Sequence, residues 1–163
     1  MNITTKLFVA LSIALAFLGL LGCGTTNHLQ TITLTAAGTT GTVEVKGIGG
    51  TLQLKATGNY TSGQTHDLTH VVTYVITPTG TDVNSGLALP TPPQGATLSS
   101  TGLVTAVLPG VCSFKYAKAS TPPAYSLTGS YQVIATFGGI SSQPMYVAMA
   151  SATGDGPNSA CGP

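Results

Sequence analysis

The sequence predicts an all-β fold, in which short strands pack into a β-sandwich. Three observations support this prediction. The composition is rich in Thr, Val, Gly and Ser, with 21 Gly and 10 Pro, which are the residues of strands and turns. Residues after position 23 keep no apolar i, i+3, i+4 pattern over three helical turns. Short alternating segments are instead separated by turn residues at the spacing that is typical of a sandwich.

Residues 1–22 are predicted to be a signal peptide. Lys6 precedes an apolar run over residues 7–21, which is shorter than the ~20 residues that a membrane-spanning helix needs. The run ends in Leu20-Leu21-Gly22-Cys23, which resembles the lipobox of bacterial lipoproteins. This resemblance implies cleavage before Cys23 and lipid attachment to the Cys23 thiol. An ordinary secretory signal whose cleavage site happens to lie beside a cysteine is the alternative.

The lipobox resemblance also implies a place in the cell. Lipid on Cys23 would hold the protein at a membrane, since two or three acyl chains give a stable anchor. Gly24 follows the cysteine in place of an acidic residue. In a bacterium with two membranes this favours the outer membrane. Residues 23–30 then form a short lipidated tether, which would keep the domain close to the membrane surface.

The predicted domain covers residues 31–150 and contains eight strand candidates. Most alternate between apolar and polar side chains, and Pro78 is expected to end the fourth. Ser100-Thr101-Gly102 supplies a residue for the positive φ of a tight hairpin between the fifth and sixth. The candidates are residues 31–35, 42–46, 51–56, 71–76, 96–98, 103–107, 131–137 and 145–149. Residues 151–163 form a Gly- and Pro-rich tail.

Two stretches are similar to one known family. Residues 52–60, continuing to 67–74, and residues 96–107, continuing to Pro109-Gly110, resemble the bacterial immunoglobulin-like domain of group 2, which occurs in invasin- and intimin-type surface proteins. The resemblance implies an immunoglobulin-like β-sandwich with no shared catalytic residues. This chain departs from the family pattern in two long insertions, at residues 77–94 and 112–127. They are the first place to look for a binding surface of its own, or they are loops without function.

The remaining cysteines are predicted to form a disulfide. Cys112 and Cys161 are an even pair in an exported protein, and the bond would tie the tail to the second insertion. Two free thiols are the alternative. Tyr116 and Tyr125, both inside the second insertion, are the residues that we expect to make surface contacts.

We expect neither catalysis nor a cofactor. The sequence has no nucleophile elbow, phosphate loop or zinc motif. His66 and His70 would lie ~13 Å apart on a strand, too far for one metal ion. Five scattered lysines and no arginine argue against nucleic acid as a partner.

The sequence therefore favours a non-catalytic envelope protein. Its domain would serve in adhesion, in binding a protein or a glycan, or as a spacer. The alternatives are a small-molecule-binding or hydrolytic lipoprotein, and a domain that pairs with its own copies through an open sheet edge.

Overall fold

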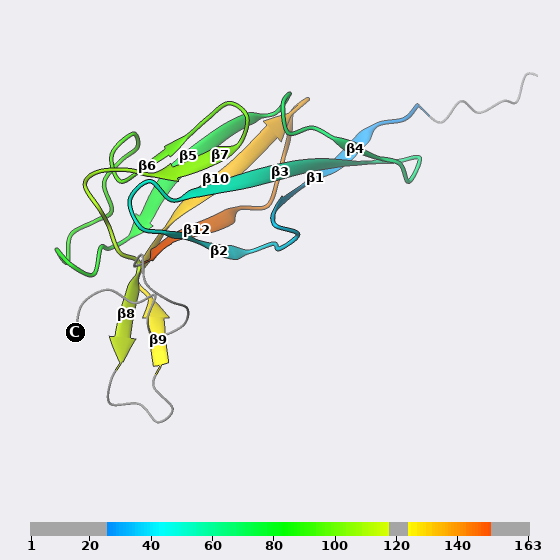
Figure 1. The fold of residues 1–163 in the computed structure, drawn as a ribbon. Coiled ribbons are helices and arrows are strands. Elements are labelled where there is room, and N and C mark those ends of the chain that lie inside the picture. Colours follow the sequence, from blue (N-terminus) through cyan, green and yellow to red (C-terminus); the bar gives the residue numbers. More distant parts are fainter. Residues whose placement is uncertain (1–25, 118–123, 151–163) are drawn as a thin grey trace, which may run out of the picture.

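A computed structural model describes residues 26–117 and 124–150 of the chain. Within these residues the fold is all-β, with no helix, and two sheets pack face to face as a β-sandwich (Figure 1). The predicted fold class is thereby confirmed at this level. The strands are β1 (Leu29–Ala36), β2 (Thr42–Lys46), β3 (Thr51–Tyr60), β4 (Thr65–Asp67), β5 (Thr73–Gly80), β6 (Ala96–Leu98), β7 (Leu103–Ala106), β8 (Phe114–Ala117), β9 (Ala124–Leu127), β10 (Gly129–Phe137), β11 (Ile140–Ser141) and β12 (Met145–Ala150).

The first sheet has the order β1-β3-β7-β6, and the short β4 also pairs with β3. All of these pairs are antiparallel. The β6–β7 hairpin turns at Gly102, whose φ is +79°, as its sequence predicts. The Gly102 N–H donates to the Ser99 carbonyl at 3.1 Å, which closes the turn.

The second sheet places β5 on one side of β10 and β12 on the other, with β2 beyond β12. β2 runs parallel to β12, whereas the other pairs are antiparallel. β11 pairs with the last residues of β10. The chain therefore leaves the first sheet at the end of β1 and enters the second through β2.

The core lies between the two sheets and follows from the alternation of side chains along each strand. Buried residues of β1, β3 and β7 face those of β10 and β12. The largest fully buried side chain is that of Tyr131, on β10. A smaller cluster lies outside this core, where Phe114 packs against Ala148 and Ala150.

Two of the differences from the sequence-based expectation concern the insertions. Pro78 lies within β5 and does not end it, because β5 continues to Gly80. The Thr81 N–H donates to the Thr128 carbonyl, and in an antiparallel pair every second residue bonds to the partner strand. Residues 79, 77, 75 and 73 therefore direct their N–H and C=O groups toward β10. The nitrogen of Pro78 therefore points away from β10, to the side of β5 that has no partner strand among the described residues. Its missing N–H costs no hydrogen bond between strands. The second difference is that the second insertion contains a hairpin, β8–β9.

Candidate binding surface

Both insertions emerge at one end of the sandwich, and the first described residues, 26–28, lead into β1 at the other (Figure 1). They are held at the tip of β3, where the His28 N–H donates to Thr61 Oγ1 at 3.0 Å and the Thr61 N–H donates to the His28 carbonyl at 2.9 Å. β3 leads from this tip to the opposite end. We call that opposite end the distal end, and it carries the loops after β2, β5, β7 and the β8–β9 hairpin.

Asp82 joins the first insertion to the start of the second. It is 6% exposed, and its Oδ1 accepts the backbone N–H of Cys112 at 2.7 Å. Its Oδ2 accepts both the backbone N–H and the hydroxyl of Ser85, at 2.9 and 2.8 Å. The Val83 N–H in turn donates to the Cys112 carbonyl at 2.9 Å. Asp82 is therefore a structural carboxylate, which fixes two loops relative to each other.

The charge of Asp82 is maintained by these donors. Burial alone raises the pKa of the carboxyl, but hydrogen bonds from Cys112, Ser85 and Asn84 outweigh burial and bring the pKa below its ordinary value. Asp82 thus stays ionised in the folded protein at neutral pH. A general acid would need the opposite shift, so this carboxylate is not prepared to donate a proton.

Tyr131 fastens the other end of the first insertion. Its hydroxyl donates toward the carbonyls of Pro90 at 3.0 Å and Gln94 at 3.4 Å, although the ring lies in the core. Gly95 makes room for this hydroxyl, because a Cβ at Gly95 would meet Tyr131 Oη. Burial, followed by the charge of Asp82, raises the pKa of Tyr131 to about 12.

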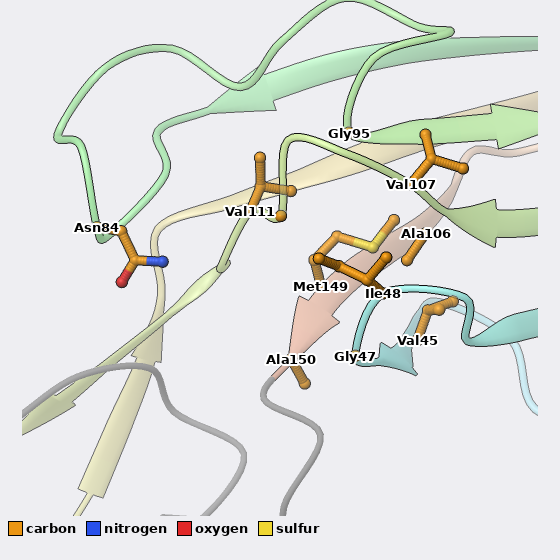
Figure 2. A pocket seen from close by; sticks show the side chains of 11 residues that line it. Val45, Gly47, Ile48, Asn84, Gly95, Ala106, Val107, Val111, Met149 and Ala150 are labelled. Atoms are coloured by element: carbon orange, nitrogen blue, oxygen red, sulfur yellow. The ribbon is translucent and has the colours of Figure 1, made fainter.

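An apolar cavity of about 280 Å³ opens at the distal end (Figure 2). Side chains from separate segments converge on it, since Ile48 follows β2, Val107 and Val111 follow β7, and Met149 belongs to β12. Asn84 of the first insertion lies at its edge. None of the lining residues carries a charge.

Three large apolar side chains of the distal loops remain in solvent: Ile48 lines the cavity, Leu87 belongs to the first insertion, and Leu108 follows the lining residue Val107. Ile48 is 61% exposed, Leu87 69% and Leu108 70%. A second, more open groove of about 440 Å³ shares Asn84, Gly110 and Val111 with the cavity, and Leu87 lines it. We call Ile48, Leu87, Leu108 and the two hollows between them the distal apolar surface. Its signal in the sequence is an apolar residue set among turn residues, as in Gly47-Ile48-Gly49 and Gly86-Leu87-Ala88.

The residues that the sequence proposed for a site are placed in part. Tyr116 and Tyr125 are register partners across the β8–β9 hairpin, so the backbone brings them together beside the distal end. The Cys112 side chain is fully buried. Cys23 and Cys161 lie outside the described residues. Lipidation and the disulfide therefore stay predictions.

The histidines are dispersed. The His66 ring packs edge-to-face on Tyr60, with ring centroids 5.0 Å apart. In the part of the chain that the structure describes, no three His, Cys, Asp or Glu side chains come close enough to hold a metal ion. Over the same residues, no helix has the length and apolar character to cross a membrane.

No protein-family model and no curated protein matches the chain. The resemblance to the group 2 bacterial immunoglobulin-like domain therefore stays a prediction.

Proposed function

We propose that this protein is a non-catalytic, lipid-anchored component of a bacterial cell envelope, whose immunoglobulin-like domain binds a protein or a glycan through its distal apolar surface. The observation that carries the proposal is the polarity of the domain. The tether enters at one end, and both insertions and three exposed large apolar side chains lie at the other. Apolar side chains gathered on a surface are typical of interaction sites.

The strand order supports an immunoglobulin-like assignment. In such a domain the first sheet has strands A, B, E and D, and the second has C, F and G. Here β1-β3-β7-β6 corresponds to A-B-E-D and β5-β10-β12 to C-F-G. Tyr131 lies near the start of the F-like strand, where this fold class has its tyrosine corner, but its hydroxyl bonds to the Pro90 carbonyl, 41 residues earlier, and not to backbone a few residues upstream.

The lipid anchor is supported by the sequence of residues 1–23. Growth of the host cells with a labelled fatty acid tests it directly. The full chain is expected to take up label, and Cys23→Ser is expected to take up none and to leave the membrane fraction. Label retained by Cys23→Ser would contradict lipidation at this residue.

We further propose that Cys112 and Cys161 form a disulfide. The Ser113 N–H donates to the Met149 carbonyl at 2.8 Å, so Cys112 lies beside the end of β12, and Cys161 follows eleven residues after Ala150. The bond would close a loop of 49 residues, from Cys112 to Cys161. In the chain-entropy model, closing this loop stabilises the fold by about 4 kcal/mol. Intact mass tests the bond, since reduction should add two hydrogens. An unchanged mass would show free thiols.

Binding is tested with the chain from residue 24 onward. Labelled protein is applied to immobilised envelope proteins and to a glycan array, and the variant Leu87→Asp with Leu108→Asp is compared with it. A charge at these positions should weaken binding at least about tenfold, since an interface would have to desolvate it. The matched control is Phe137→Asp, which charges an exposed apolar residue at the tether end of β10. An equal loss of binding in both variants would exclude the distal apolar surface as the binding site.

Small-molecule binding is the second candidate, because the groove of about 440 Å³ has a volume in the range of ligand sites and the cavity of about 280 Å³ lies just below that range. Asp82 is the one ionisable group that lines either of them within the described residues, and three hydrogen-bond donors occupy its carboxylate. A ligand there would be held by apolar contact. Binding of an uncharged fluorescent probe that Val111→Trp abolishes would favour this candidate.

A further inference from the structure

The edges of the two sheets differ in how they are protected. Among the described strands, the main edges are β1 and β6 in the first sheet and β5 and β2 in the second, and the short β4 and β11 also have one unpaired side. β6 has three residues, which is short, and β2 carries the charged Glu44 and Lys46. β1 is closed at its end by the two hydrogen bonds between Ala36 and Thr39. The backbone groups of Ile32 and Leu34 point away from β3, but both are core residues and each is only 4% exposed. β5 has none of these protections along its first half.

The alternation of backbone directions along β5 shows which of its N–H and C=O groups have no partner strand among the described residues. Because residues 73, 75, 77 and 79 bond to β10, Tyr74 and Ile76 direct their N–H and C=O groups away from the sheet. No described residue forms a hydrogen bond with these four backbone groups. Both residues are partly exposed, so the groups are within reach of another chain. Two donors and two acceptors therefore lie side by side at an open edge.

The side chains of β5 favour association with another strand. The strand has no charged residue, and its outer-face residues Thr73, Val75, Thr77 and Thr79 are all exposed and β-branched. Val75 is an apolar side chain with 55% of its surface in solvent. Pro78 lies beyond the segment that contains the free N–H groups, so it limits the length of pairing without preventing it.

We propose that β5 pairs with β5 of a second copy of this chain, antiparallel and about a two-fold axis through Val75. In this register Tyr74 lies opposite Ile76 of the second copy, and the reverse pair is identical by symmetry. All four free groups of each strand are then used in four hydrogen bonds. The two second sheets join into one continuous sheet across the axis.

The partner of the β5 edge is a second copy of the chain, because this edge is complementary to itself. Val75 faces Val75 of the second copy in the closely spaced, non-hydrogen-bonded position, where two exposed apolar side chains cover each other. Thr73 faces Thr77 of the second copy on either side of this pair. No like charges meet, and the interface requires no rearrangement of the sandwich. The inference does not depend on the lipid anchor.

The test uses the chain from residue 24 onward, kept oxidised or reduced throughout, from micromolar to millimolar concentration. Sedimentation should show a monomer–dimer equilibrium. Amide hydrogen exchange should slow with concentration at Tyr74 and Ile76, whereas Val75 and Thr77, which bond to β10, should be protected at all concentrations. A chain that stays monomeric up to millimolar concentration, or a dimer without protection at these two amides, would overturn the proposal.

The decisive variant is Val75→Lys, which places two ammonium groups opposite each other across the axis. It should weaken the dimer at least about tenfold. Val71→Lys is the matched control, because Val71 is 57% exposed, precedes β5 and meets no copy of itself. An equal effect of both variants would mean that the contact lies elsewhere. Urea unfolding of each monomer checks that neither change acts through the fold.

Discussion

At the residue scale, a few buried polar groups hold long loops against a core that is otherwise apolar. Asp82 is buried in the loop after β5 and Tyr131 in the core, and they reach backbone groups of the first insertion or of the segment after β7. A buried carboxylate or hydroxyl would cost free energy without partners, and here each has at least two. The first insertion and the start of the second are therefore fixed parts of the distal end.

Tyr131→Phe should lower the free energy of unfolding by about 1–2 kcal/mol, because the carbonyls of Pro90 and Gln94 lose their donor while the ring still fills the core. Urea unfolding measures the loss. Tyr146→Phe, on the same sheet and partly exposed, is the control and should change little.

The pH dependence of unfolding provides a second test of Tyr131. Its folded pKa of about 12 lies above the ordinary value of 10.0, so its contribution is complete below pH 10 and disappears as the pH rises toward 12. Between these pH values the wild type should lose more stability than Tyr131→Phe. Parallel curves would contradict the role of the hydroxyl.

Asp82→Asn should destabilise the fold by about 2 kcal/mol, since the amide nitrogen cannot accept the hydrogen bonds that one carboxylate oxygen now accepts. The folded pKa of Asp82 is lowered, so its contribution is present above pH 3.8 and is lost as the pH falls further. Acid titration of the unfolding midpoint should therefore be flatter in the variant. Asp67→Asn is the control, because the Asp67 side chain is 58% exposed and its substitution should cost less.

At the element scale, the β6–β7 hairpin depends on Gly102. Alanine there would adopt a φ of +79°, and its Cβ would lie 2.8 Å from Tyr74 Oη and 3.2 Å from the Leu54 carbonyl oxygen. Gly102→Ala should thus cost about 2 kcal/mol or more. Gly86→Ala separates the two causes, because Gly86 also has a positive φ but no atom within 4 Å of the added Cβ. Thermal unfolding of both variants should show the smaller loss for Gly86→Ala.

Strand positions could be predicted where the pattern is local. Residues 42–46 and 96–98 coincide with β2 and β6, and the turn at Gly102 follows from one residue type. The prediction at Pro78 was wrong because a proline ends a strand only when its nitrogen points toward the partner strand. That direction is set by the pairing with β10, which the sequence does not show. From the sequence alone, residues 112–127 are recognisable only as an insertion, whereas the structure has the β8–β9 hairpin there.

The candidate site could be predicted only in outline. Long insertions marked the distal end, but no local pattern shows that the Tyr131 hydroxyl meets Pro90, 41 residues earlier in the chain. The cavity likewise depends on side chains from β2, β7 and β12, which only the completed fold brings together. Ile48, Leu87 and Leu108 could have been recognised as apolar residues placed in turns.

At the scale of the whole molecule, the direction of the long axis decides where the proposed binding would take place. A short tether would keep the domain near the membrane, but its entry at the tip of β3 leaves the distal end about 30 Å away, since β3 has ten residues at ~3.3 Å each. If the axis stands upright, the distal apolar surface faces away from the membrane and is open to partners. If the axis lies flat, lipid would compete for the same apolar side chains.

Fluorescence quenching can separate these two orientations. The lipidated protein is placed in vesicles that contain a quencher on the lipid headgroups, with a fluorescent side chain introduced at Ser62, near the tether, or at Leu87, at the distal end. An upright domain should show strong quenching at Ser62 and little at Leu87. Cys23→Ser, which should not bind the vesicles, is the control for free protein. Similar quenching at both positions would mean that the domain lies flat, and the distal apolar surface would then be a membrane contact in place of a partner site.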